Sequence, residues 1–130
     1  MSERSSGNLI APWLSLRDSH RALDFYTRAF DAVETYHLDT PDGVIARLSV
    51  GGAQFWIGPG GEETRGPGPE AVGGGTLRLI LIVADPDAAF ARAIRAGATE
   101  VFPVAESHGW RLGRLTDPFG LHWEIGYELA

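Results

Sequence analysis

The sequence has no cysteine among its 130 residues. Disulfide bonds, thiolate zinc sites and cysteine nucleophiles are therefore excluded. Long apolar runs are also missing, since no stretch approaches the roughly 18 residues that a membrane span needs. Residues 1–8 are polar and lack the apolar run of a signal peptide. These absences predict a cytoplasmic protein without a membrane partner.

An excess of basic residues is lacking as well, because the formal net charge is −6. A protein that binds a nucleic-acid backbone needs a basic face, so no nucleic-acid partner is expected. The net negative charge is compatible with a cationic or neutral small ligand. Alternatively, it serves only to keep the protein in solution. The length and the hydrophobic content of 44% fit one globular domain over residues 1–130.

Four elements occur twice along the chain in the same order. Residues 9–58 and residues 76–127 each contain an apolar strand, an amphipathic helix and three short strands. Between them, residues 59–75 are dense in glycine and proline. This composition predicts either a flexible connector or a flap over a site.

Capping residues mark where the two helices begin. Asp85 followed by Pro86 is a favourable helix start, and Gly97 stands where a C-terminal cap belongs. In the first half, either Asp18 or Ser19 is expected to cap the helix. Strands rich in Val, Ile, Phe and Trp follow each helix, so each half has the order β-α-β-β-β.

The repeat predicts an α+β fold in which two βαβββ modules form curved mixed sheets around a cup-shaped pocket. Each helix covers one face of its sheet. A lone four-stranded sheet would expose its other face, so the two halves must pair within one chain or across a dimer. A homodimer is expected, and the sequence leaves open whether the modules pair within a chain or swap between chains.

Several short motifs stand in register with this repeat. They are Leu14-Ser15-Leu16-Arg17-Asp18, Ala22-Leu23-Asp24-Phe25-Tyr26, Ala29-Phe30, Ala96-Gly97-Ala98 and Asp117-Pro118-Phe119-Gly120. Taken in order, they resemble the vicinal oxygen chelate superfamily, which includes glyoxalase I, extradiol dioxygenases and the bleomycin-resistance proteins. The resemblance extends over about residues 9–127 and supports the predicted fold.

The resemblance also implies where a metal site would lie. Metalloenzymes of this superfamily hold a divalent ion with four cup-lining residues, typically His, Glu, His and Glu. The matching positions here are Ala11, Trp56, Leu79 and Glu124, of which only the glutamate can coordinate a metal. We therefore predict no metal and no cofactor. The alternative is an atypical site built from Glu124, His122 and an unforeseen third ligand. The other histidines are expected at the surface: His20, His37 and His108.

Strand alternation selects the side chains that line the predicted cup. The ligand-binding candidates are Trp13, Ser15, Gln54, Trp56, Leu79, Trp110, His122 and Glu124. Trp110 either closes the rim or packs against the core. Trp13 and Trp56 either face a ligand or fill the core, and Trp123 is expected in the core under the second helix.

Glu124 has two open interpretations. An unpaired carboxylate in an apolar cup has a raised pKa and can act as a general base or accept a hydrogen bond from a ligand. Alternatively it pairs with Arg47, Arg111 or Arg114 on neighbouring strands. No residue is predicted to be catalytic.

The leading functional hypothesis is a metal-free small-molecule binding protein that resembles the bleomycin-resistance type and sequesters an aromatic or cationic drug or metabolite. An apolar lining with a few polar groups is typical of small-molecule sites. A divalent-metal-dependent lyase, isomerase or dioxygenase with an atypical site is the alternative. A third hypothesis is an interaction domain whose cup is filled by its own side chains.

Overall fold

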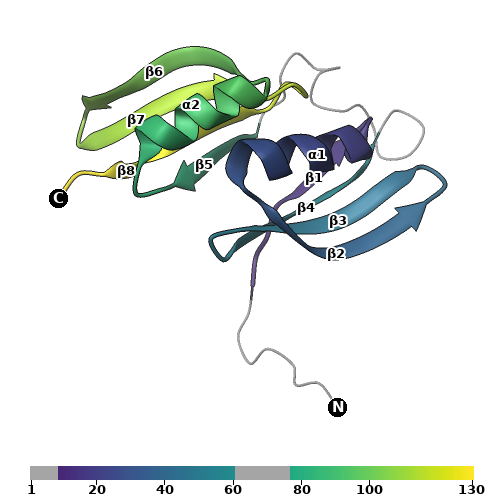
Figure 1. The fold of residues 1–130 in the computed structure, drawn as a ribbon. Coiled ribbons are helices and arrows are strands. Elements are labelled where there is room, and N and C mark those ends of the chain that lie inside the picture. The colour runs from purple at the N-terminus through teal and green to yellow at the C-terminus, as the bar shows by residue number, and fades with distance from the viewer. Residues whose placement is uncertain (1–8, 61–76) are drawn as a thin grey trace.

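The computed structural model describes residues 9–60 and 77–130, which form two similar halves (Figure 1). The first module contains β1 (Trp13–Leu16), α1 (Ser19–Phe30), β2 (Val33–Thr40), β3 (Gly43–Val50) and β4 (Ala53–Pro59). The second module contains β5 (Arg78–Ile82), α2 (Pro86–Ala96), β6 (Thr99–Ser107), β7 (Trp110–Thr116) and β8 (His122–Glu128). The predicted α+β fold of two βαβββ modules is confirmed. The predicted connector 59–75 lies outside the described residues except for its first two positions.

Each module forms one mixed four-stranded sheet. The strand order is β1-β4-β3-β2 in the first sheet and β5-β8-β7-β6 in the second. β1 pairs with β4, and β5 with β8, in parallel, whereas the other neighbours are antiparallel. Over the described strands the two sheets remain separate and do not close into a barrel.

The two helices are short, and each begins at an aspartate. The side chain of Asp18 accepts a hydrogen bond of 3.0 Å from a backbone N–H in the first turn of α1, and Asp85 caps α2 in the same way at 3.2 Å. Ser19 is already helical, and its hydroxyl instead accepts the N–H of Val44 on β3 at 2.9 Å. Neither described helix has the length and apolar character that crossing a membrane requires.

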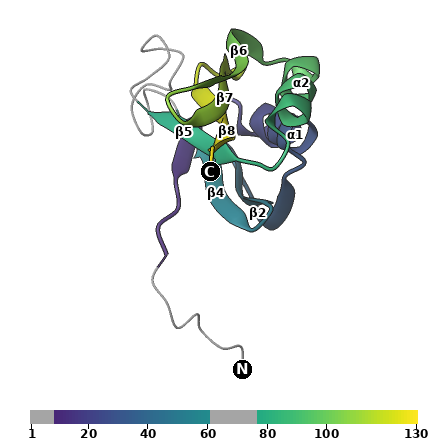
Figure 2. The same ribbon diagram turned by 90° about the vertical axis from the view of Figure 1, so that its left-hand side faces the viewer.

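The two modules meet through their helices and one shared core. Figures 1 and 2 show α1 and α2 lying next to each other. The guanidinium Nε of Arg92 on α2 donates to the carbonyl of Arg28 on α1 at 2.8 Å. The ring of Trp123 packs against Phe30 of α1 and Phe55 of β4, with centroids 4.6 and 5.8 Å apart. The predicted core position of Trp123 is confirmed by its 4% exposure, but its ring neighbours include residues of the first module.

Asp117, in the turn between β7 and β8, is the polar centre of this core and is only 5% exposed. Its Oδ2 accepts the hydroxyl of Tyr26 at 2.6 Å and the indole N–H of Trp123 at 2.9 Å. Its Oδ1 accepts the backbone N–H groups of Phe119 and Leu121 at 2.9 and 3.0 Å. Because a buried carboxylate is costly without such partners, these four donors take the place of water.

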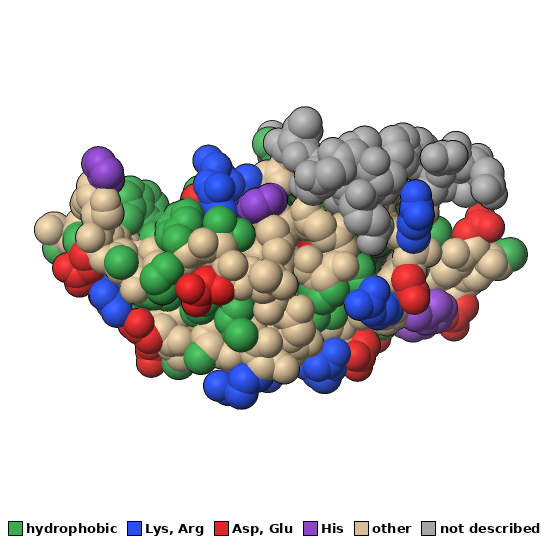
Figure 3. All heavy atoms as spheres, turned by 90° about the horizontal axis from the view of Figure 1, so that it is seen from above, with side chains coloured by type: hydrophobic (Ala, Val, Ile, Leu, Met, Phe, Trp, Pro, Cys, Tyr) green, Lys and Arg blue, Asp and Glu red, His purple; other side chains and the backbone are tan. Residues whose placement is uncertain are grey.

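Charges of both signs are mixed on the outer surface. In Figure 3, seen from above, Arg side chains alternate with Asp and Glu along the rim of the molecule. One of the closest surface ion pairs links Arg111 on β7 to Asp87 on α2, with an N–O distance of 2.7 Å. Such exposed pairs contribute little to stability because water and salt screen them, so the core and not the surface holds the modules together.

We predict that removing single members of the Asp117 cluster destabilises the whole chain. Tyr26→Phe removes one donor and is expected to lower the free energy of unfolding by about 1–2 kcal/mol. Asp117→Asn places an amide N–H₂ against groups that are themselves donors, so we expect a larger loss, about 2–4 kcal/mol. Chemical denaturation followed by fluorescence measures both values.

Asp24→Asn is the matched control, because Asp24 forms only an exposed pair with Arg28. Its effect should stay below about 0.5 kcal/mol. If Asp117→Asn were as mild as this control, the proposed role of the cluster would be wrong.

Candidate ligand-binding site

Each sheet has one face turned toward the helices and one open face turned away from them. On the second sheet, Glu124 pairs with Ile80 on one side and with Arg114 on the other, so these three side chains share the open face. Leu79 instead pairs with Trp123 and packs against the core. Leu79 therefore lies on the helix side of the sheet, and Ile80 occupies the place in the cavity wall where Leu79 was predicted.

A cavity of about 410 Å³ lies on the open face of the second sheet. Its wall is mainly apolar, and its polar side chains come from the β6–β7 hairpin and from β8. The lining residues are Ile80, Phe102, Ala105, Ser107, His108, Trp110, Leu112 and Glu124. The volume falls within the range of roughly 300–1,000 Å³ that small-molecule sites occupy.

Glu124 is a paired carboxylate. Its side chain is 13% exposed, and its Oε2 accepts a hydrogen bond of 2.9 Å from Arg114 and lies 3.7 Å from Nε of Arg78. Pairing with Arg114 was one of the predicted alternatives, and the unpaired alternative is wrong. Arg111 binds Asp87 on the helix side, while Arg47 belongs to the first sheet.

Arg114 connects this ion pair to the cavity wall. Its guanidinium carbon lies 5.5 Å from the centre of the Phe102 ring, which lines the cavity. Its Nε is buried and has no hydrogen-bond partner among the described residues, and the same is true of Nδ1 of His122. A buried donor without an acceptor costs about 1–3 kcal/mol, so this corner of the site has unused capacity to bind an acceptor.

The open face of the first sheet carries a cluster of aromatic rings, which we call the aromatic platform. Trp13 and Trp56 stack with centroids 6.0 Å apart and an interplanar angle of 16°, and Tyr36 lies 5.4 Å from Trp56. The guanidinium of Arg47 lies 5.3 Å from the Trp56 ring. The Trp13 indole N–H donates to the hydroxyl of Ser15 at 3.1 Å.

The platform depends on a glycine beneath it. A Cβ at Gly58 would lie 2.4 Å from the Trp13 ring, a distance that real side chains do not reach. A larger residue at this position would therefore displace Trp13.

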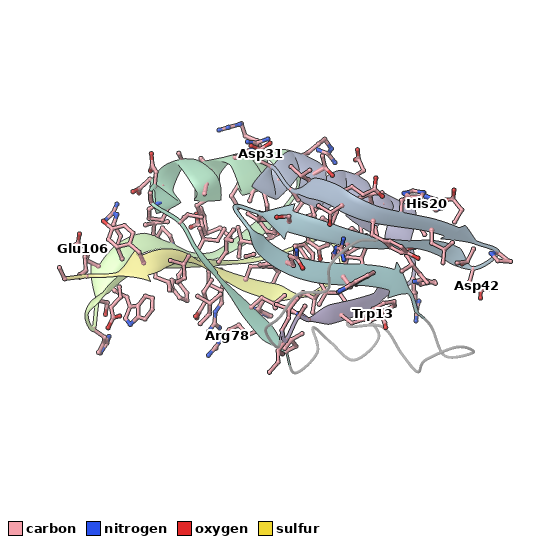
Figure 4. All side chains as sticks on the ribbon, turned by 90° about the horizontal axis from the view of Figure 1, so that it is seen from below. Trp13, His20, Asp31, Asp42, Arg78 and Glu106 are labelled. Atoms are coloured by element: carbon pink, nitrogen blue, oxygen red, sulfur yellow. The ribbon has the colours of Figure 1, made fainter. Side chains whose placement is uncertain are left out.

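Gln54, at the other end of β4, pairs across the sheet with Ser49 and is partly buried. Figure 4 shows Trp13 and Arg78 in the middle part of the molecule, between Glu106 and Asp42 at its two ends.

The structure divides the predicted site residues between two surfaces. Trp13, Ser15, Gln54 and Trp56 lie on the first sheet, whereas Trp110, His122 and Glu124 lie on the second. Only Trp110 and Glu124 of the predicted set line the cavity. Six further lining residues were not predicted from the sequence: Ile80, Phe102, Ala105, Ser107, His108 and Leu112.

The donor atoms do not fit the metal site of the metalloenzymes. Of the four matching positions, Ala11 and Trp56 offer no ligand atom, and Leu79 points into the core. No group of three or more His, Asp or Glu side chains within the described residues is placed to hold a metal ion. Glu124, the remaining position, is engaged by two arginines.

His37 lies outside the site, as expected for an exposed histidine. On β2 its ring nitrogens contact the carboxylates of Glu34 and Asp39, the latter at 3.0 Å. These hydrogen bonds, that to Glu34 first, raise the pKa of His37 above its ordinary value of 6.5. His20 is also exposed, whereas the exposed His108 borders the cavity.

Comparisons with known proteins show which proteins this chain resembles in sequence and in fold. The sequence pattern of the glyoxalase-like domain matches residues 13–125. An uncharacterized protein of Mycobacterium bovis is 37% identical over 126 residues, which covers 90% of this chain and 81% of that protein.

Among solved structures, TioX from a Micromonospora species has a TM-score of 0.74 and 27% identity, covering 95% of this chain and 100% of that one. TnmS3, an antibiotic binding protein from a Streptomyces species, has a TM-score of 0.72 and 19% identity, covering 97% of this chain and 99% of that one. At that identity the likeness to TnmS3 concerns the fold.

We predict that the two carboxylates control the titration of His37. An NMR titration should place its pKa above 6.5, and Glu34→Gln or Asp39→Asn should lower it. Because the folded state favours protonated His37, the stabilisation is complete below the unfolded pKa near 6.5 and is lost as the pH rises through the higher folded value. Asp42→Asn, in the neighbouring turn, should leave the midpoint unchanged. An unchanged midpoint in Glu34→Gln would contradict the assignment.

Proposed function

Because the chain belongs to the vicinal oxygen chelate superfamily as a glyoxalase-like domain, we propose that it binds and sequesters a small, mainly apolar organic molecule without transforming it. The observation that carries this proposal is the cavity on the second sheet. Its wall offers two aromatic rings, Phe102 and Trp110, together with three aliphatic side chains. A site of this kind binds by burying apolar surface and by ring stacking.

The residues favour binding over metal-assisted chemistry. The lyases, isomerases and dioxygenases considered as the alternative need a divalent ion with open coordination positions, and the donor set here does not supply the ligands. Glu124 does not replace them, because Arg114 and Arg78 already engage its Oε2. TnmS3, which shares this fold, is an antibiotic binding protein, so the architecture is compatible with binding a small organic molecule.

We also propose that two copies of the chain pair through their open faces. Seven large hydrophobic side chains on these faces are 39 to 62% exposed, which is more exposed apolar surface than a monomeric protein usually has. They are Trp13, Val33, Tyr36, Leu38, Ile80, Ile82 and Phe102. Since the modules repeat, a two-fold axis brings the aromatic platform of one copy over the cavity of its partner, twice in the same dimer. The ligand would then lie between the two.

Filling the cavity should abolish ligand binding. Ala105 lies on β6 at the cavity wall, and Ala105→Trp inserts a ring into the space. We expect aromatic compounds, polycyclic antibiotics among them, to raise the melting temperature of the wild type but not of this variant. Ala91→Trp, on the exposed side of α2, is the control and should respond as the wild type does. Equal responses of both variants would place the binding elsewhere, and no response of the wild type to any compound would contradict the proposal.

The dimer makes a separate prediction. Analytical ultracentrifugation should give twice the chain mass of 14.0 kDa at micromolar concentration. Leu38→Asp places a charge in the apolar contact and should shift the equilibrium toward the monomer. Ala91→Asp adds the same charge to the outer surface and should not. A wild-type protein that sediments as a monomer would overturn the proposed pairing.

A further inference from the structure

The open faces carry a charge opposite to that of the chain. The ionised strand residues described on these faces are Arg47, Arg78, Arg114, Glu124 and Glu128. Cations therefore outnumber anions here, although the whole chain has a formal net charge of −6. Glu128 lies at the exposed end of β8, which leaves Glu124 as the one carboxylate within this described part of the surface.

Two guanidinium groups share one oxygen of that carboxylate. Arg114 donates to Oε2 of Glu124 at 2.9 Å, and Nε of Arg78 lies 3.7 Å from the same atom. Each guanidinium has five N–H donors in a planar fork. A single shared oxygen satisfies few of them, and one positive charge stays uncompensated.

The partly buried surroundings of Arg114 strengthen the effect of the uncompensated positive charge. Arg114 is 23% exposed and lies over Phe102, so water reaches it only partly. Electrostatic interactions strengthen where water is excluded. The Nε of Arg114 is in addition buried without an acceptor in the described structure. Charge and hydrogen-bonding capacity thus point to the same missing partner, an anion with acceptor oxygens.

We propose that the ligand is an organic carboxylate, with a flat apolar body in the cavity and its acidic group paired with Arg114 and Arg78. This rests on the proposed function, because the cavity must hold the body of the ligand. A planar carboxylate matches the fork of a guanidinium and forms short, charge-assisted hydrogen bonds with it. The ligand is then anionic rather than cationic, since a cation at this corner would meet two guanidinium groups.

Three probes with the same ring system separate charge from shape. They are 2-naphthoate, 2-naphthalenemethanol and 2-naphthalenemethylammonium, each titrated by calorimetry into the wild-type protein. We expect naphthoate to bind about tenfold more tightly than the alcohol and the ammonium compound to bind most weakly. The advantage of naphthoate should shrink as ionic strength rises.

Variants then locate the charge. Arg78→Gln, at an exposed edge position, and Arg114→Gln should each reduce naphthoate affinity while leaving the affinity for the alcohol unchanged. Glu124→Gln removes the competing carboxylate and should raise naphthoate affinity several-fold. Arg95→Gln, on the outer side of α2, is the control and should change neither affinity. A melting curve for each variant shows that it is folded, and Arg78→Gln keeps the test valid if Arg114→Gln is unstable.

The outcomes distinguish the two proposals. If none of the three probes binds to the wild type, the proposed function fails and the charge assignment fails with it. If the alcohol or the ammonium compound binds as tightly as naphthoate, the cavity is a binding site but the inference of an acidic ligand is overturned. A loss of naphthoate affinity in Glu124→Gln would likewise overturn it, because Glu124 would then be a direct contact and not a competitor.

Discussion

The carboxylate of Asp117 is buried between the two modules and has no ion-pair partner among the described residues, so its four hydrogen bonds have to be in place together. Two of the donors are backbone N–H groups of its own turn, and the other two are the hydroxyl of Tyr26 and the indole of Trp123. If Tyr26 moved away, a buried anion would lose a donor and a buried hydroxyl would lose its acceptor. The hydrogen bonds therefore hold α1 against the turn that precedes β8.

This constraint decides how the open faces are presented. With α1 fixed to the second module and α2 lying beside it, both helices occupy one side of the molecule and both open faces turn away from them (Figure 2). The two faces have diverged although the modules repeat. The first sheet carries a stack of rings over Gly58, whereas the second has a cavity beside an ion pair. The aromatic rings of the first face and the cavity of the second have complementary shapes, and the proposed pairing of two copies would bring them together.

Features that depend on local chemistry could be predicted from the sequence. The aspartate caps, the order of elements and the core position of Trp123 follow from capping preferences and strand alternation. The cavity could not be predicted in the same way. β5 is apolar on both faces, so its alternation did not distinguish Leu79 from Ile80. β6 has register shifts on either side of Phe102, and such irregularities destroy the period that would have placed this ring at the site.

The net charge of the chain did not indicate the charge at the site, because it sums over side chains that lie far from the cavity. Several acidic side chains have partners outside the site. Glu34 and Asp39 flank His37 on β2, and Asp87 forms an ion pair with Arg111 on the helix side. The open face of the second sheet retains two arginines for one central glutamate. An acidic protein can therefore present a locally cationic site, and screening over about 8–10 Å at physiological salt keeps distant carboxylates from cancelling it. The local balance is set by the nearest ionised groups, and around Glu124 the two arginines Arg78 and Arg114 exceed the single carboxylate by one positive charge.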